Sequence, residues 1–272
     1  MGFSNHLKQK LLNKYGSWAL VTGASSGIGM ALSKRLAEAG FNLVLHGRNA
    51  TALAELSSGL EDTWSVATDV IISDISSTSS VVGLIESLGD LPIGLFIASA
   101  GFGTSGDFID SDLDEEIKML QVNNLALMML THHFSRVFAQ KGGGGIILMS
   151  SIVGFQGVPK ASHYAATKAY VQSLGEGLHH ELKPHQVDVL AAAPGPVASG
   201  FGKIADMQMT SALTPEDVAL PILKSLGKKS TVFPGRLTQI LIFGLRTVPR
   251  WGKIRIMKMV MGGMTKHQKA IA

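Results

Sequence analysis

The chain has no cysteine among its 272 residues, which excludes disulfides, thiolate metal sites and cysteine nucleophiles. Charged residues make up only 16% and aromatic residues 6%, whereas 46% are hydrophobic. This composition argues against disorder and predicts a core large enough for independent folding. No apolar run reaches the about 18 residues that a membrane-spanning helix needs, and the N-terminus lacks the apolar core of a secretory signal. We therefore expect a soluble, cytoplasmic protein.

Acidic residues are missing from the C-terminal part. All 20 Asp and Glu lie at or before Asp217, together with 13 of the 24 Lys and Arg, and the other 11 basic residues lie in 218–272. The net charge of +4 hides this asymmetry. Such segregation creates a local positive field that favours anionic ligands, lipid headgroups or an acidic partner surface.

What the chain does contain is a regular alternation of short apolar runs and helix-forming segments. Glycine-bounded apolar runs suit strands buried on both faces, so we predict an α/β fold with a doubly wound, Rossmann-type parallel sheet and helices on both faces. One domain is expected over 1–272, with a substrate lid around 197–214 and a basic C-terminal extension around 236–272. The expected strands are 18–22, 41–46, 70–73, 94–99, 146–150 and 187–193, and the expected helices are 30–39, 51–60, 78–88, 114–140, 164–182 and one from 215.

A glycine-rich loop, TGASSGIG at 22–29, follows the first apolar run. Gly23 suits a tight turn, Gly27 leaves room for a diphosphate, and Gly29 lets the helix pack close to the strand. The helix N-terminus would then receive the negative charge. An ordinary strand–helix turn also uses glycines, but the position between an apolar run and a helix favours a dinucleotide site.

Arg48 lies at the end of the second expected strand, where the adenosine ribose of a dinucleotide would lie. Arginine pairs with a 2′-phosphate, which favours NADP(H) over NAD(H), and Ser25 and Ser26 can donate to the same phosphate. The alternative is a solvated arginine in a surface turn, which the lack of an Asp or Glu close to it disfavours. Asp74 suits acceptance from the adenine amino group, or a helix cap.

Tyr164 and Lys168 are spaced by four, which puts the phenol and the ammonium on one helical face. We expect the positive charge to lower the phenol pKa from its reference value of about 10. Ser151, after another apolar run, can hold a substrate carbonyl oxygen while Tyr164 protonates it. Such a pair also arises by chance on exposed helices. Together with the glycine loop and Ser151, it predicts interconversion of a carbonyl and an alcohol.

These motifs, in this order, closely resemble the short-chain dehydrogenase/reductase family over about the first 200 residues. The matching elements are TGASSGIG at 22–29, Asp74, ASAG at 98–101, Asn123, Ser150 and Ser151, YAATK at 164–168, and PGPVAS at 194–199.

The resemblance implies a catalytic tetrad of Asn123, Ser151, Tyr164 and Lys168. Ser151 would orient the carbonyl, Tyr164 would act as acid or base, Lys168 would also hold the nicotinamide ribose, and Asn123 would hold a water linked to Lys168. A homodimer or homotetramer is implied as well. The implied cofactor-binding residues are Gly23, Ser25, Ser26, Gly27, Ile28, Gly29, Arg48, Asp74, Ile75, Ala100, Gly101, Tyr164, Lys168, Pro194, Gly195, Val197 and Ser199.

Two positions depart from the family pattern. The usual Asn-Asn-Ala-Gly reads Ala98-Ser99-Ala100-Gly101, so we expect Ser99 to supply part of the bracing that the missing amides would give. Ser199 replaces the more usual threonine and keeps the hydroxyl.

The start of the matching region, KYGSWALVTGASSGIG at 14–29, looks like that of hydroxysteroid dehydrogenases and long-chain 3-oxoacyl reductases. Phe201, Ile204, Met207 and Met209 in the expected lid agree with an apolar substrate, although such side chains are more often part of a core. We predict an NADP(H)-dependent oxidoreductase that interconverts a ketone or aldehyde and an alcohol on an acyl, steroid-like or other lipid-like substrate. The alternatives are an NAD(H)-preferring dehydrogenase of small alcohols and a non-catalytic dinucleotide-binding sensor or scaffold, which the intact tetrad disfavours.

The C-terminal segment interleaves Trp251 and other apolar residues with basic ones over 249–261. Peripheral attachment to an anionic membrane is one interpretation. Dimer packing, or capture of an acidic carrier or thioester substrate, is the alternative, because the basic residues scatter around a helical wheel. No nucleic-acid partner is expected, since aromatic stacking groups are scarce there. No metal is expected either, because the adjacent histidines of the two His-His pairs diverge by about 100° on a helix.

Overall fold

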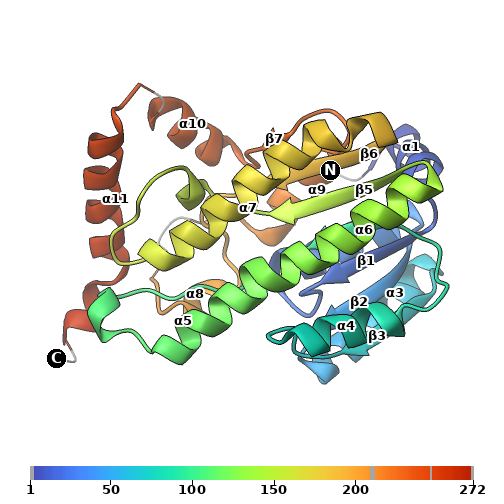
Figure 1. Cartoon of the computed structure of the whole chain (residues 1–272), viewed down its shortest axis with the longest axis horizontal. Coiled ribbons are helices and arrows are strands. Elements are labelled where there is room, and N and C mark those ends of the chain that lie inside the picture. The colour runs from blue at the N-terminus through green and yellow to red at the C-terminus, as the bar shows by residue number, and fades with distance from the viewer. Residues whose placement is uncertain (1–2, 209–211, 246, 271–272) are drawn as a thin grey trace.

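The computed structural model describes residues 3–208, 212–245 and 247–270. Its centre is a seven-stranded parallel sheet of order β3-β2-β1-β4-β5-β6-β7 (Figure 1). This confirms the predicted doubly wound sheet. The strands are β1 Trp18–Thr22, β2 Asn42–Gly47, β3 Thr68–Ile72, β4 Ile93–Ala98, β5 Gly144–Met149, β6 Val187–Ala192 and β7 Thr231–Val232.

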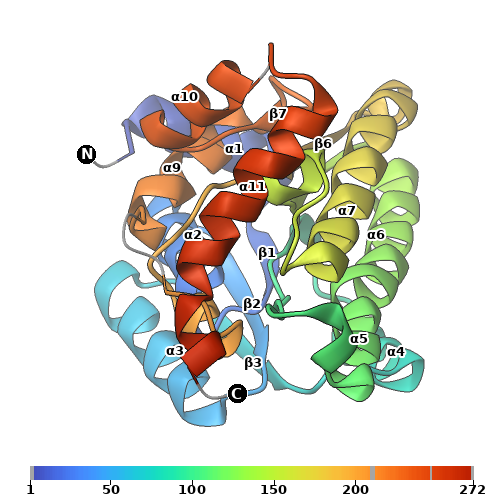
Figure 2. The same ribbon diagram turned by 90° about the vertical axis from the view of Figure 1, so that its left-hand side faces the viewer.

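Helices cover both faces of the sheet. In Figure 2, α2, α3 and α9 lie on one side of the strands and α4, α6 and α7 on the other. Each side has its own buried apolar cluster, because the strands present hydrophobic side chains to both faces. The helices are α1 Asn5–Tyr15, α2 Gly27–Ala39, α3 Ala50–Trp64, α4 Thr78–Ser87, α5 Leu113–Leu120, α6 Leu127–Lys141, α7 Ser162–Glu181, α8 Phe201–Ile204, α9 Pro215–Ser225, α10 Arg236–Leu245 and α11 Arg250–Met264.

The sequence of the central strands explains their position. Every residue of β4 (IGLFIA) and of β5 (GGIILM) is buried. Continuous apolar runs of this kind suit strands with a helical layer on each side. Thr22 at the end of β1 pairs with His46 of β2 and with Ala98 of β4, so the loops after these three strands begin at the same level.

The elements that differ from the prediction include the short strand β7, which no expected range covered, and two helical ones. The first helical one is α1, which no pattern indicated; it is capped by Ser4, and its Leu11 and Tyr15 join the core on the α2 side. The second is the helix expected over 114–140, which is α5 and α6 joined by a π-helical segment, Gln121–Ala126. A π-helical segment inside a helix often accompanies a functional site.

The segment 197–214, expected to be an irregular lid, contains α8 and a bridge between Val197 and Leu213 at its two ends. Met209, assigned to it above, lies outside the described residues. The following helix, α9, begins with a capping box between Thr214 and Asp217, in agreement with the expected start at Pro215.

The basic C-terminal segment folds into α10 and α11 and a short 3-10 turn, Lys266–Ala270. Both helices lie on the side of the molecule toward which the strands point (Figures 1 and 2). Met257 and Met261 of α11 are buried in the cluster on the α7 side. Among the described residues, every helix is too short or too polar to cross a membrane.

Candidate functional site

The predicted site residues follow the carboxyl ends of the strands. In a parallel sheet, ligands bind at this edge, where the strand order reverses. Here the reversal lies between β1 and β4, since β2 and β3 lie on one side of β1 and β4 to β7 on the other. The glycine loop follows β1, and the Ala100–Gly101 pair follows β4, so both flank the reversal.

The glycine loop is so tight that side chains would not fit. A Cβ atom on Gly29 would lie 2.2 Å from the carbonyl oxygen of Gly23, and one on Gly23 would lie 2.8 Å from the Cα of Ala100. Gly23 also has a φ of +71°, which L-residues rarely adopt. Ser26, the N-cap of α2, makes no side-chain hydrogen bond to the first turn. The backbone N–H groups of that turn are therefore available to an anion.

The loop after β6 reaches the glycine loop. A Cβ atom on Gly27 would lie 3.1 Å from the Cβ of Ser199. The structure therefore brings together the glycine loop, assigned to the diphosphate, and Ser199, one of the cofactor-binding residues that the resemblance implies. Of the apolar residues assigned to the cofactor, Ile75 is buried in the core and Ile28 is partly buried in α2, so contact with a ligand there would fall on the backbone.

Arg48 has an acidic neighbour that the sequence analysis did not anticipate. Its guanidinium lies 3.6 Å from the Asp74 carboxylate, and both side chains are about half exposed. Burial acts to raise the pKa of Asp74, but hydrogen bonds from Ser76 and the Arg48 charge outweigh it and hold the pKa below its usual value. A Cβ atom on Gly47 would lie 3.2 Å from the hydroxyl of Ser25, so Ser25 lies beside the residue directly before Arg48, which suits a shared phosphate site.

The brace after β4 comes from Thr22. Its hydroxyl accepts hydrogen bonds from the backbone N–H groups of Ser99 and Ala100, each at 3.2 Å, and donates to the carbonyl of Ile97 at 3.4 Å. The expectation that the Ser99 side chain supplies the brace was therefore wrong, since Ser99 takes part through its backbone. Thr22 is the first residue of TGASSGIG, so one motif both begins the glycine loop and holds the neighbouring strand end.

Tyr164 and Lys168 lie on consecutive turns of α7 and are buried, with 9% and 6% of their surface exposed. The Lys168 Nζ lies 5.8 Å from the centre of the Tyr164 ring and donates to the carbonyl of Met149 at 2.9 Å. Ser151 lies after β5, and its hydroxyl reaches the carbonyl of Pro194 at 3.5 Å. Three of the four tetrad residues thus converge from α7 and the end of β5.

Asn123 completes the cluster from the π-helical segment. Its amide donates to the carbonyl of Phe102 at 2.8 Å and accepts from the N–H of Phe102 at 3.1 Å. A Cβ atom on Gly101 would lie 2.8 Å from the Asn123 Oδ1 and 3.5 Å from the Lys168 Nζ. Gly101, Asn123 and Lys168 therefore meet at one point, and Asn123 holds the loop after β4 beside the lysine.

The pKa values of Tyr164 and Lys168 differ from the expectation. Burial raises the pKa of the Tyr164 phenol above its usual value, and the interaction with the Ser151 hydroxyl opposes this only in part. Burial also lowers the pKa of Lys168 to about 8. The predicted lowering of the phenol pKa by Lys168 was therefore wrong for the protein alone, because the removal of both groups from water dominates.

Two further residues lie around the tetrad, one of them expected. The ring of Phe201, which was assigned to the lid, packs on Tyr164 with ring centres 5.2 Å apart, whereas Thr238 of α10, which sequence reasoning missed, accepts a hydrogen bond from the Gly195 N–H at 3.2 Å. Phe201 and Met207 pack against the core, whereas Ile204 is exposed. No local signal marks Thr238, because its partner lies 43 positions away.

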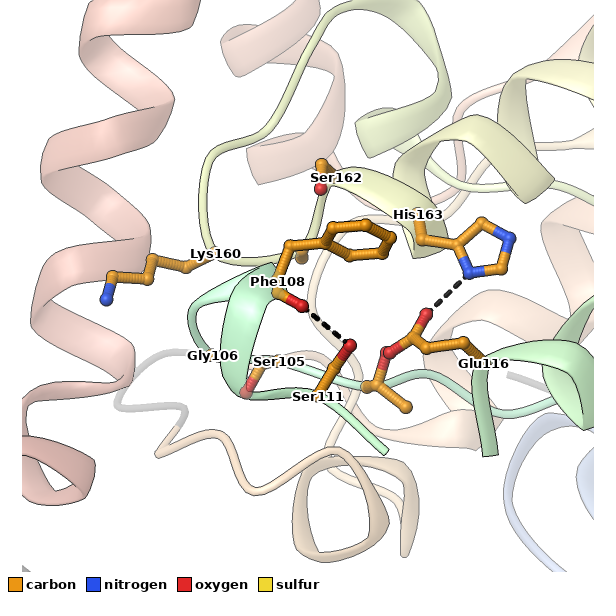
Figure 3. Close-up of a pocket in the computed structure, with 10 residues that line it drawn as sticks. Ser105, Gly106, Phe108, Ser111, Glu116, Lys160, Ser162 and His163 are labelled. Carbon is orange, nitrogen blue, oxygen red and sulfur yellow. Dashed lines mark hydrogen bonds and ion pairs between the residues drawn. The ribbon is translucent and has the colours of Figure 1, made fainter. Parts of the chain in front are cut away.

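A small pocket opens between the loop after β4 and the start of α7 (Figure 3). In this view the His163 ring points at the Glu116 carboxylate, with Nδ1 and Oε2 2.5 Å apart. Glu116 is 4% exposed and also accepts from the Thr104 hydroxyl at 2.7 Å. The buried carboxylate therefore ties the loop after β4 to the residue directly before Tyr164.

Residues 17–209 match the family model described as short chain dehydrogenase. A 7beta-hydroxysteroid dehydrogenase from Clostridium sardiniense is 31% identical over 230 residues, which cover 83% of this chain and 88% of that protein. A very-long-chain 3-oxoacyl-CoA reductase from Meyerozyma guilliermondii is 31% identical over 229 residues, which cover 79% of this chain and 66% of that protein.

Solved structures agree with these matches. A structure from a study of 7beta-hydroxysteroid dehydrogenase stereoselectivity superposes with a TM-score of 0.83 at 27% identity, covering 91% of this chain and 98% of that one. A short-chain dehydrogenase from Sphingobium yanoikuyae in complex with NADPH gives 0.76 at 28% identity, covering 85% and 93%. The matched family region contains the glycine loop and all four tetrad positions. This chain belongs to the short-chain dehydrogenase family, which makes it a nicotinamide-dinucleotide-dependent oxidoreductase that acts on hydroxyl or keto groups.

Proposed function

We propose that the protein is an NADP(H)-dependent oxidoreductase that interconverts a ketone or aldehyde and an alcohol on an apolar substrate. The observation that carries this proposal is the buried Tyr164–Lys168 pair, which lies with Ser151 at the strand edge that also holds the glycine loop. A protein that only bound the dinucleotide would gain nothing from placing Ser151 beside this buried pair.

The residues around the glycine loop fit a dinucleotide. The N-terminus of α2 would hold the diphosphate, Ser25 and Arg48 a 2′-phosphate, and the backbone at Pro194–Val197 with Ser199 the nicotinamide end. When bound, the nicotinamide supplies or accepts the hydride. That the Sphingobium yanoikuyae structure contains NADPH supports the same choice.

The chain's own residues manage the proton. In the reducing direction, the Ser151 hydroxyl donates a hydrogen bond to the substrate carbonyl oxygen, and the Tyr164 phenol transfers its proton to that oxygen. The Lys168 ammonium stabilises the tyrosinate that remains. Because burial raises the pKa of Tyr164, the phenol holds its proton until the substrate oxygen becomes basic.

The surroundings of Tyr164 favour an apolar substrate. Phe201 packs on its ring, and a Cβ atom on Gly103 would lie 2.9 Å from the ring, so the space next to the phenol is lined by apolar and small groups. The segment 197–214 contributes Phe201 and Met207 and would act as the lid. Relatives named for steroid and very-long-chain acyl substrates support a steroid-like or acyl compound.

One observation favours the alternative of NAD(H). Asp74 lies 3.6 Å from Arg48 and partly neutralises it, and a carboxylate in this region can accept hydrogen bonds from the ribose hydroxyls instead. We favour NADP(H) because the pair is half exposed, and Arg48 can leave it for a doubly charged phosphate at little cost.

We further propose a homo-oligomer formed through α5 and α7. Leu113, Ile117 and Leu120 are exposed on α5 at a helical spacing that puts them on one face, and Tyr170 is exposed on α7. The charges on α5 are net acidic, with Asp114, Glu115 and the buried Glu116 against Lys118, which lies 3.8 Å from Glu115, so the exposed apolar residues and not the charges favour this contact.

The test is a fluorescence titration with NADPH and NADH, followed by turnover of bulky ketones, in wild type, Arg48→Ala and Tyr164→Phe. We expect wild type to prefer NADPH, Arg48→Ala to lose that preference by about 10-fold to 100-fold, and Tyr164→Phe to bind NADPH normally but to lose at least about 100-fold in kcat. Undiminished turnover in Tyr164→Phe would refute the mechanism. Equal binding of both nucleotides by wild type would refute the cofactor choice alone.

A further inference from the structure

The outward face of α11 carries bulky apolar side chains between basic ones. Trp251, Arg255, Lys258 and Met259 are spaced i, i+4, i+7 and i+8, which puts them on one side of the helix. Trp251 is 64% and Met259 73% exposed, whereas Met257 and Met261 on the opposite side are buried. Packing against the protein therefore turns the two methionines inward and these four side chains outward, although the basic residues of the segment appear scattered on a helical wheel.

The preceding helix, α10, has the same pattern. Arg236, Ile240 and Phe243 are spaced i, i+4 and i+7, and Ile240 is 67% and Phe243 76% exposed. Thr238, on another side, is buried and holds the Gly195 N–H. Figure 2 looks directly at these helices, with α11 in front and α10 above it, so both belong to one surface of the molecule. We call the seven outward residues of α10 and α11 named here the α10–α11 face.

The charge of this face has one sign. No Asp or Glu follows Asp217 in the sequence, so neither helix brings an acidic side chain of its own. Among the described residues, Asp206 forms an ion pair with this part of the chain, and its partner is His267, beyond the end of α11. The Arg255 guanidinium lies over the Trp251 ring, 5.2 Å from its centre, which keeps cation and aromatic ring together at the surface.

The basic charge of the α10–α11 face indicates which kind of partner covers it. In a symmetric dimer built on it, the same patch would meet itself, and basic side chains would face basic side chains with no acid between them. An anionic bilayer has the complementary chemistry, because its headgroups neutralise Lys and Arg while Trp, Phe, Ile and Met enter the interface. The α5 face carries charges of both signs and is better suited to a second copy than the α10–α11 face.

We propose that the α10–α11 face docks the protein on an anionic lipid surface. The strands point toward this side of the molecule, so docking turns the carboxyl edge of the sheet, and the site beneath α11, toward the bilayer (Figure 1). An apolar substrate dissolved in the lipid would then enter over a short path. Docking itself does not depend on the proposed activity, and it is tested without turnover.

The experiment is flotation of the whole protein with vesicles of phosphatidylcholine alone or mixed with phosphatidylglycerol, at low and high salt. We expect binding to the anionic vesicles at low salt, a loss at high salt, and little binding to phosphatidylcholine. Arg255→Glu/Lys258→Glu should bind at least about ten-fold more weakly than wild type. The matched control, Lys228→Glu/Lys229→Glu, changes the net charge equally at exposed residues before β7, at the opposite edge, and should bind as wild type does.

A second readout reports on the wild type alone, in case the charge-reversed variant does not fold. Emission of Trp251, obtained by comparison with Trp251→Phe, should be quenched by brominated lipid in anionic vesicles. Three results would overturn the proposal: equal binding to both vesicle types, equal weakening by the two charge reversals, or dissociation of a homo-oligomer by Trp251→Ser/Met259→Ser. The last result would assign the face to a second copy of the chain.

Discussion

The two halves of the carboxyl edge are built differently. On the β1–β2 side, the loops are held by contacts between backbone atoms, such as the contact of Gly29 with the carbonyl of Gly23. On the β5–β6 side, distant side chains hold the loops, as where Thr238 of α10 accepts from Gly195. The Ser105 hydroxyl likewise donates to the carbonyl of Ala205 at 2.6 Å, and the Gln268 amide donates to Ser105 at 3.0 Å.

This difference separates what the two halves do. A backbone-built loop offers the same N–H groups to any dinucleotide, because little in it depends on side-chain identity. Loops held by side chains from α8, α10 and the C-terminal turn can change with those side chains. The glycine half therefore suits a shared cofactor, and the other half suits a particular substrate.

The largest expected effect is that of Gly29→Ala. The new Cβ would lie 2.2 Å from the Gly23 carbonyl, and since that atom is backbone, the whole loop must shift. A displacement of about 1 Å in a positioned site costs about 100-fold, so we expect the dissociation constant for NADPH to rise by at least about that factor. Fluorescence titration measures it.

Gly200→Ala is the control on the other half. Gly200 has a φ of −58°, and a Cβ atom there meets nothing within 4 Å. NADPH binding should be unchanged, and the free energy of unfolding should change by no more than about 1 kcal/mol. A similar loss in both variants would mean that the glycine half is not specially constrained.

The second effect concerns Lys168, where the halves meet. Its pKa in the folded protein is about 8, below the usual value of 10.5, so the unfolded chain binds more protons between these pH values. Stability then rises with pH through this window, by about 3 kcal/mol for the full shift. Urea unfolding of wild type and Lys168→Met at pH 7 and pH 10 should show this rise in wild type only. An equal change in the free energy of unfolding between pH 7 and pH 10 in the two proteins would contradict this prediction.

The smallest effect is that of Thr238→Val. The variant keeps the shape but leaves the partly buried N–H of Gly195 without its acceptor, which costs about 1–2 kcal/mol. Thermal or urea unfolding measures this loss, and Thr238→Ser, which keeps the hydroxyl, should recover most of it. If Thr238→Val is as stable as wild type, α10 does not hold the loop after β6.

The sequence predicted most of the elements that position the site. Apolar runs such as 94–99 and 146–150 can only be buried strands in a chain of this length, and the glycine loop marks its own turn. Prediction failed where local pattern is weak. The helix α1 is too basic and too short to show a clear periodicity, and its core residues Leu11 and Tyr15 contact a sheet formed later in the chain.

The candidate site also has parts that the sequence predicted and parts that it did not. Spacing predicted the Tyr164–Lys168 pair, and the position of the glycine loop after an apolar run predicted a dinucleotide site, whereas Asn123 was implied only by the resemblance to the family. Motifs do not predict that Asp74 meets Arg48, that Glu116 ties Thr104 to His163, or that Thr22 replaces the missing amides after β4. Each of these contacts joins residues from different strand ends.

By itself, then, the sequence determined the sheet and the family, since short-range pattern encodes backbone conformation, and it predicted the chemistry at the end of β5 and on α7. Only the tertiary structure decided the protonation of that chemistry, because the pKa values of Tyr164 and Lys168 follow from burial. It also decided the place of the basic C-terminal segment. Composition gave that segment its charge, but packing of Met257 and Met261 selected which side chains face outward.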